Sequence, residues 1–244
     1  MRAESPTRGV APESGSLAPW WHTTPLIVLI VAVAITGIAL QFTASSGVAQ
    51  LAPRAPAPPP NARILSQYLP LLLVNGGLTA YVSRVLRPRN ALPDLLGRRW
   101  HTARQALTDL SFALALLLFI QAFEALSVHA LPPGRNAALR ALLPSTEAER
   151  LTWLLVALSV GFCEEVVYRG YLQKQLSAFT GSPSLGIALQ ALLFGLAHAE
   201  QGVGPALRIA LYGLALGILA QYRKSLLPGI VCHLLIDLAS ALPR

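Results

Sequence analysis

Charged residues are scarce in this chain of 244 residues: 12% are Asp, Glu, Lys or Arg, against about 25% in ordinary globular proteins. Hydrophobic residues make up 54%, and the mean hydropathy is +0.54. They are concentrated in recurring runs of roughly 20 residues, the length that a helix needs to cross the hydrocarbon core of a bilayer. These properties exclude a water-soluble core and a disordered chain, and they predict a polytopic α-helical membrane protein.

Cysteine is scarce too, with two residues, Cys163 and Cys232. They form no CxxC pair, so a disulfide scaffold, a structural zinc knuckle and a redox motif have no support. Each precedes a charged or imidazole side chain, Glu164 and His233, which raises the alternatives of a nucleophilic thiol or a soft metal ligand. We favour a small apolar residue at a helix contact, because neighbours along a helix point in different directions.

The apolar runs predict an all-α fold, a polytopic transmembrane helical bundle of about seven spans. They fall near residues 25–44, 64–84, 105–128, 150–172, 184–200, 204–222 and 225–242. The predicted organisation is a polar N-terminal tail at 1–24, N-terminal transmembrane helices at 25–130 and a C-terminal transmembrane core at 148–242. The first run is longer than the apolar part of a signal peptide, so we expect it to be retained, with cleavage near Gly47 and Ala49 as the alternative.

Lys and Arg predict the orientation. With the N-terminus on one side, the segments on that side hold 12 of the 19 basic residues, six of them within 84–104. The positive-inside rule then predicts a cytoplasmic N-terminus. The basic loops make a lipid bilayer the expected partner and nucleic acid a poor one. The excess of Arg over Lys, together with abundant Ala, is typical of a bacterial genome rich in GC, and suggests the bacterial inner membrane.

Ionisable residues at bilayer depth are costly and are therefore functional candidates. They cluster on spans four, five and seven: Glu164, Glu165, Arg169, His198, Glu200, His233 and Asp237. Span three adds Asp109 and Glu124 near its ends, where a helix-packing hydrogen bond is an adequate explanation. The same structural explanation is the alternative for the whole cluster. Gly213 and Gly217 form a GxxxG motif on span six, which favours a packing seam over a site.

Helical geometry separates the roles of these residues. Glu165 and Arg169 are four residues apart, the spacing at which a carboxylate meets a guanidinium. Adjacent Glu164 points about 100° away and has no local cation. A poorly hydrated carboxylate without a counter-charge binds a proton readily, which suits a general base that later acts as an acid.

The two imidazoles have partners at the same spacing. Asp237 can accept a hydrogen bond from one nitrogen of His233 and so fix what the other nitrogen presents, which suits either a metal ligand or a donor to an oxyanion. Phe194 and His198 share a face of span five, where the phenyl ring would help to exclude bulk water.

Together these residues resemble a known family. Residues 164–169 read EExxxR, Phe194 to His198 reads FxxxH, and His233 to Asp237 reads HxxxD, in the order found in the CPBP family of intramembrane proteases. That family includes the type II CAAX prenyl endopeptidases and the bacterial Abi proteins, which are associated with bacteriocin processing and self-immunity. The resemblance covers about residues 148–242 and leaves the first three spans without an assigned motif.

The resemblance implies an endopeptidase in which Glu164 and His198 activate water against a scissile peptide bond. His233 and Asp237 would stabilise the oxyanion or complete a metal site, while Glu165, Arg169 and Phe194 support the site. The sequence has Asp at 237 where the eukaryotic prenyl enzymes have Asn, which shifts its role towards orienting His233 or binding metal.

The chemistry leaves two mechanisms open. Glu164, His198 and His233 would form an ordinary zinc set with a position left for water. The sequence contains no HExxH motif, and the metal-free glutamate mechanism is preferred. GxSG and GxGD motifs are also absent, which argues against the serine and aspartyl classes of intramembrane protease.

The predicted spans place the candidate residues at inconsistent depths in the membrane. Counted from the predicted cytoplasmic ends of the spans, Glu164 and His233 lie about eight residues deep but His198 about 15, a gap of roughly 10 Å at 1.5 Å per residue. Either span five starts elsewhere or residues 173–184 enter the membrane.

The leading hypothesis is proteolysis of a peptide or protein substrate in or at the membrane, such as a bacteriocin-like precursor, a sorting tail or a prenyl-type C-terminus. The last is disfavoured in a bacterium, where the prenylated partner would be missing. The first alternative is a catalytically silent membrane scaffold that binds a partner. A transporter with Glu164 and His198 as a proton relay is a weaker one.

Overall fold

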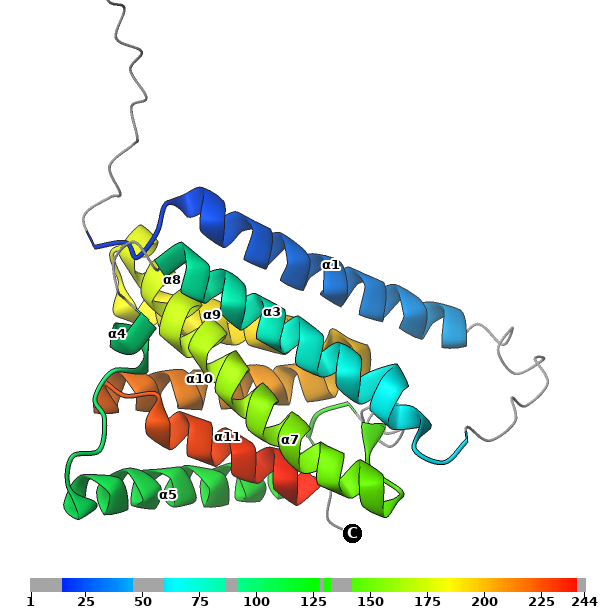
Figure 1. Cartoon of the computed structure of the whole chain (residues 1–244). Coiled ribbons are helices and arrows are strands. Elements are labelled where there is room, and N and C mark those ends of the chain that lie inside the picture. Colours follow the sequence, from blue (N-terminus) through cyan, green and yellow to red (C-terminus); the bar gives the residue numbers. More distant parts are fainter. Residues whose placement is uncertain (1–14, 46–58, 87–91, 128–129, 133–141, 241–244) are drawn as a thin grey trace, which may run out of the picture.

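The computed structural model describes residues 15–45, 59–86, 92–127, 130–132 and 142–240. Regular secondary structure in these residues is helical, apart from an isolated β-bridge between Gly97 and Ser225. The long helices pack side by side, with α1 along one edge of the bundle and α5 along the opposite edge in Figure 1. The predicted all-α helical bundle is confirmed.

The first half of the chain supplies the outer helices. They are α1 (Trp20–Ser45), the π-helical η1 (Ile64–Tyr68) that continues into α3 (Leu69–Leu86), the short α4 (Leu92–Leu96) and α5 (Ala103–Ser127). Their large apolar side chains are widely exposed, as expected for surfaces that face lipid.

The second half forms the centre of the bundle. Its elements are α7 (Glu147–Glu164), the π-helical η3 (Glu165–Leu172), α8 (Gln173–Thr180), α9 (Pro183–Leu196), the 3₁₀ turn η4 (Ala199–Gln201), α10 (Val203–Arg223) and α11 (Leu227–Ser240). The first three join into one continuous helix, Glu147–Thr180. A π-helical segment at this position is notable because such segments are frequent at functional sites.

Five helices among the described residues are long and apolar enough to cross a membrane, so the chain is an integral membrane protein. All seven predicted spans correspond to apolar helices, but the fifth and seventh, α9 and α11, have only 14 residues each. Fourteen residues are fewer than the 17 or so that a full span needs. The count of seven spans is therefore not confirmed.

Local sequence signals explain where the central helices begin and end. Thr146 caps α7 by accepting a hydrogen bond from the backbone N–H of Glu149, a preferred N-cap arrangement. Gly181 ends α8 with a φ of +66°, a left-handed conformation that costs glycine little. Ser182 and Pro183 then start α9 at once. The result is a tight hairpin of α8 and α9.

This hairpin resolves the inconsistency in depth. The helix predicted to end at residue 172 continues to Thr180. Measured from the turn at Gly181, Glu164 stands 16 residues before Thr180 and His198 stands 15 residues after Pro183, so the two lie at similar levels. The error lay in the end of span four, whereas the start predicted for span five differs from the observed start by one residue.

The Gly213–Gly217 motif of α10 is a packing seam, as predicted. A Cβ at residue 213 would lie 3.2 Å from Cα of Ala191, and one at residue 217 would lie 2.6 Å from Nε2 of Gln190. Both contacts are with α9. The small residues let the two helices approach closely, which fixes the face of α9 that carries Gln190 and Phe194.

Asp109 and Glu124 join α5 to α10 at two levels. Asp109 accepts hydrogen bonds from Nε of Arg223 at 2.7 Å and from the indole of Trp100 at 2.8 Å. Glu124 pairs with Nε of Arg208 at 3.2 Å and accepts a hydrogen bond from the hydroxyl of Tyr212. Both carboxylates therefore have the helix-packing contacts that the sequence suggested.

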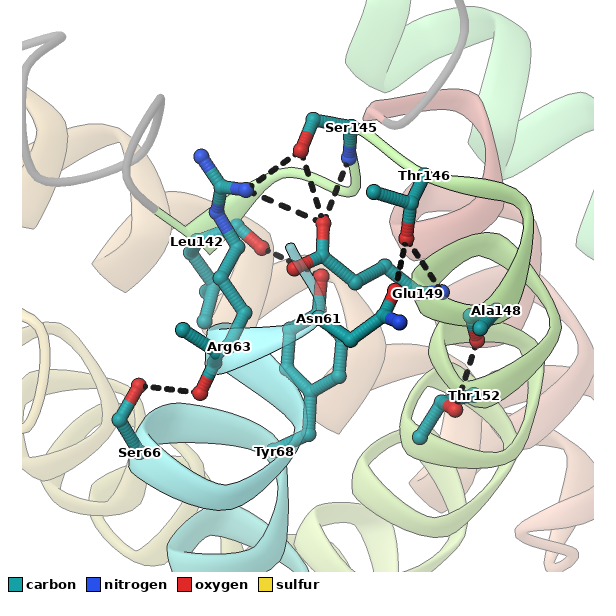
Figure 2. Close-up of polar contacts among 11 residues, drawn as sticks. Asn61, Arg63, Ser66, Tyr68, Leu142, Ser145, Thr146, Ala148, Glu149 and Thr152 are labelled. Atoms are coloured by element: carbon teal, nitrogen blue, oxygen red, sulfur yellow. Dashed lines mark hydrogen bonds and ion pairs between the residues drawn. The ribbon is translucent and has the colours of Figure 1, made fainter. Parts of the chain in front are cut away.

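A second polar network closes the N-terminal end of α7 (Figure 2). One carboxylate oxygen of Glu149 accepts hydrogen bonds from the backbone N–H and the hydroxyl of Ser145 and from Nη1 of Arg63, at 2.8 to 3.0 Å. Tyr68 donates to the carbonyl of Leu142 nearby. This network ties the start of α7 to η1.

Candidate active site

Glu165 lies at the centre of a buried cluster between η3 and α11. Its Oε1 atom is 2.8 Å from Nη1 of Arg169 and 3.0 Å from Nδ1 of His233. The side chains of Glu165 and Arg169 have no exposed surface. The predicted contact between these two residues is present, and each charge needs the other because neither reaches water.

The ring of Phe194 packs against three members of the cluster. The guanidinium of Arg169 stacks 4.1 Å from the ring centroid, a distance suited to a cation–π contact. The centroids of the His198 and His233 rings lie 5.0 and 5.9 Å away. Phe194 therefore joins the residues of α9 to those of η3 and α11, and it holds both imidazoles at fixed positions.

His198 follows the end of α9 and is the residue that precedes η4. Its Nδ1 atom lies 2.9 Å from the carbonyl oxygen of Phe194. Because a carbonyl oxygen only accepts, Nδ1 carries the proton. In the neutral ring Nε2 is then a free acceptor.

His233 is oriented by a different residue from the one expected. The spacing predicted that Asp237 accepts from its ring, but Nδ1 contacts Glu165, and Nε2 lies 3.6 Å from Oε2 of Glu164. Both ring nitrogens thus face carboxylates of the neighbouring helix. The prediction failed because it considered only contacts within one helix.

Asp237 still lies in the neighbourhood of the cluster. Its carboxylate interacts electrostatically with His233, Glu164, His198 and Glu165. Its backbone carbonyl accepts a hydrogen bond from the indole of Trp153 at 3.3 Å, which anchors this part of α11 on α7. The four residues predicted to be catalytic therefore lie in one region of the bundle.

Glu164 differs from Glu165 in its hydrogen bonding. Its side chain is 15% exposed. Its Oε2 atom is buried and has no hydrogen-bond partner among the described residues, because 3.6 Å to His233 is too long for a hydrogen bond. Oε2 of Glu165 also lacks a partner there, but its side chain has no exposed surface, so Glu164 is the carboxylate of the pair that a reacting molecule can approach.

Two glycines that the sequence did not single out allow this arrangement. A Cβ at Gly161 would lie 3.2 Å from the backbone nitrogen of Leu234, and one at Gly229 would lie 2.9 Å from Oε2 of Glu165. They bring the α7–η3 helix and α11 into close contact, so that Glu165 reaches His233. Isolated glycines on helices that face each other gave no signal in the sequence alone.

Buried amides also support the site and were not predicted. Gln190 donates to the carbonyl of Gly213 at 2.9 Å, and Gln173 donates to that of Gly217 at 3.1 Å. Gln190, Phe194 and His198 are spaced by four residues along the chain. An amide on that apolar face was the signal that could have identified Gln190.

Both cysteines are buried and free. Cys232 has no exposed surface and packs among Ala113, Ile120 and Leu216. Cys163 lies 3.9 Å from the hydroxyl of Ser159. Cys232 thus occupies the small apolar contact that the sequence favoured for the two cysteines.

The donor types present would suit zinc. The Nδ1 atoms of His198 and His233 are bonded to a carbonyl and a carboxylate, the usual supports of metal-binding imidazoles. Within the described ranges, however, no three His, Cys, Asp or Glu side chains are placed to hold a metal ion together. As positioned, Glu164, His198 and His233 do not form the zinc set that the sequence offered as an alternative.

Comparison with known protein families gives one match. Residues 146–239, from the N-cap of α7 to the last turn of α11, match the model described as Type II CAAX prenyl endopeptidase Rce1-like. No curated protein and no solved structure matches the chain significantly. The matched region contains every residue of the cluster.

Proposed function

Because residues 146–239 match the Type II CAAX prenyl endopeptidase Rce1-like model, which describes a family of proteases, we propose that this membrane protein is an intramembrane endopeptidase. It hydrolyses a peptide bond of a membrane-associated peptide or protein, with Glu164 as the group that activates water. The proposed substrates are a bacteriocin-like precursor or a sorting tail at the C-terminus of another membrane-associated protein.

The observation that carries this proposal is the contrast between two adjacent carboxylates. Oε1 of Glu165 is engaged by Arg169 and His233. Oε2 of each glutamate is buried without a hydrogen-bond partner among the described residues, but the side chain of Glu164 is 15% exposed and that of Glu165 has no exposed surface. A general base must come within reach of the proton that it removes, so the partly exposed Glu164 is the better candidate of the two.

In the proposed reaction Glu164 takes a proton from water as the oxygen attacks the scissile carbonyl carbon. The neutral His198 ring presents an unprotonated Nε2 that accepts the second hydrogen and so orients the water molecule. Glu164 then gives its proton to the departing amine nitrogen as the C–N bond breaks. The products are an amine and a carboxylic acid, which releases its proton to solvent to become a carboxylate, and Glu164 returns to its starting state.

His233 stabilises the negative oxygen that forms during attack. With Nδ1–H on Glu165, protonation of Nε2 creates an imidazolium that donates to the oxyanion. Glu165 and Asp237 supply the negative charge that favours this cation. Asp237 therefore acts through His233. This indirect role suits an acidic residue, because a carboxylate anion is a poor direct hydrogen-bond donor to an oxyanion.

The first experiment compares the membrane proteome of cells that carry wild-type protein with cells that carry Glu164→Ala or His198→Ala. A substrate should accumulate uncleaved in both variants, while the variant proteins reach wild-type levels. Glu147→Gln is the matched control, because Glu147 is an exposed carboxylate near the start of the same helix.

Purified protein then tests the mechanism on the identified substrate. Glu164→Ala should lower the cleavage rate by about 10² to 10⁴, the usual contribution of a general base. Full activity in Glu164→Ala would refute the assignment. A wild-type phenotype in cells with both alanine variants would instead support the silent scaffold.

A further inference from the structure

A basic hollow lies at the N-terminal end of α5, remote in sequence from the candidate active site. It has a volume of about 150 Å³, and its lining includes Arg98, Arg99, Trp100, His101 and Arg223. An adjoining hollow shares Arg223 and adds Arg104. The two hollows are thus lined by four arginines, from the segment before α5, the start of α5 and the end of α10.

The charge of this hollow is largely uncompensated. Asp109 is the carboxylate in its lining, and its two oxygens are already bonded to Arg223 and Trp100. Arg98, Arg99 and Arg104 are exposed, and none of them has an ion pair within the part of the chain that the structure describes. The hollow therefore favours an anion with several acceptor oxygens, for which guanidinium groups are well suited.

An apolar stripe runs along α5 on the side next to Arg104. Leu107, Leu110, Leu114 and Leu118 recur at intervals of three or four residues, so they share one face of the helix. Each is at least 41% exposed. Arg104, three residues before Leu107, stands at the end of the same stripe. Arg104 and the four leucines therefore form one surface of α5, cationic at its N-terminal end and apolar along its length.

We propose that this surface is a binding site for an anionic phospholipid. The phosphate is held by Arg98, Arg99 and Arg104, and an acyl chain lies along the leucines of α5. Trp100, which is 38% exposed, lies at the headgroup level, where tryptophan is enriched. The leucine stripe is the reason to assign a lipid instead of a soluble phosphate, because a free anion would gain nothing from it.

Native mass spectrometry of the full chain, delipidated in detergent, tests the proposal. The probes are phosphatidylglycerol, phosphatidylcholine with the same acyl chains, and inorganic phosphate. We expect wild type to retain phosphatidylglycerol in preference to phosphatidylcholine. Each substitution Arg98→Gln, Arg99→Gln or Arg104→Gln should weaken binding about fivefold, the effect of about 1 kcal/mol per cation near an anionic surface.

Two controls make the outcomes decisive. Arg84→Gln and Arg150→Gln remove exposed arginines elsewhere in the chain and should leave phosphatidylglycerol binding unchanged. If they weaken binding as much as the substitutions at the proposed site, the effect is one of overall charge and the proposal is overturned. Leu110→Ser and Leu114→Ser should weaken lipid binding but not the binding of inorganic phosphate. Competition by millimolar phosphate, with no effect of the leucine variants, would identify a soluble anion site and also overturn the proposal.

Discussion

Two glutamates at opposite ends of α7 differ in what surrounds them. Glu149, at the start of α7, is 1% exposed, and one of its oxygens accepts three hydrogen bonds, from Arg63 and from two atoms of Ser145 (Figure 2). Glu164, at the end of α7, has a buried oxygen with no partner within the described residues. A buried carboxylate oxygen alone therefore does not distinguish a structural carboxylate from a catalytic candidate. The distinction lies in whether the protein already uses its hydrogen-bonding capacity.

Glu165 provides the strongest test of this distinction, since it is fully buried and bonded to two partners. Glu165→Gln should destabilise the protein by about 3–5 kcal/mol, because it leaves the guanidinium of Arg169 buried without a counter-charge. Thermal and denaturant unfolding in detergent would measure the loss. The exposed Glu147→Gln is the control. A variant as stable as wild type would mean that the ion pair contributes little to the fold.

Glu149→Gln should have an intermediate effect on stability. The amide keeps an acceptor oxygen for the donors on Arg63 and Ser145, which all bond one oxygen of Glu149, but it removes the negative charge that pairs with Arg63. Since Arg63 is partly exposed, we expect a loss of about 1–3 kcal/mol, with proteolytic activity per folded molecule unchanged. Lost activity in a fully folded Glu149→Gln protein would contradict the structural role of this network.

Gly229→Ala tests how closely α11 must approach the catalytic helix. The added methyl carbon would lie 2.9 Å from Oε2 of Glu165, so one of the two must shift. We expect a stability loss of at least about 1 kcal/mol and reduced cleavage, measured on the same purified samples. Gly77→Ala is a suitable control, because a Cβ there meets no atom within 4 Å.

Chelation should have the smallest effect. The proposed mechanism uses Glu164 as the base, so removal of divalent metal by EDTA or phenanthroline should leave the cleavage rate unchanged. Elemental analysis of the purified protein should be run in parallel. Inhibition by chelators that stoichiometric zinc reverses would replace the glutamate mechanism with the metal-dependent one.

The sequence predicted the helical bundle and the contact between Glu165 and Arg169, because both depend on local signals. Apolar runs mark helices, and residues four apart on one helix meet, as Glu165 and Arg169 do. These features need no knowledge of how the helices pack.

Features that depend on packing were missed. Span four was ended too early because Gln173, Lys174 and Gln175 resemble a loop, whereas Gln173 and Gln175 are buried and bond to the backbone of other segments. The partner of His233 was missed for a similar reason. Whether Asp237 or Glu165 reaches the ring is decided by the approach of two helices, and hydropathy and spacing within one helix contain no information about it.

The ion pairs between α5 and α10 have a consequence for biogenesis. When α5 leaves the ribosome, Asp109 and Glu124 enter the translocation machinery before Arg223 and Arg208, which neutralise them, have been synthesised. Uncompensated carboxylates make partition into lipid costly. We therefore expect final integration of α5 to depend on α10, so that a nascent chain that stops before Arg208 keeps α5 at the insertion channel or near a chaperone.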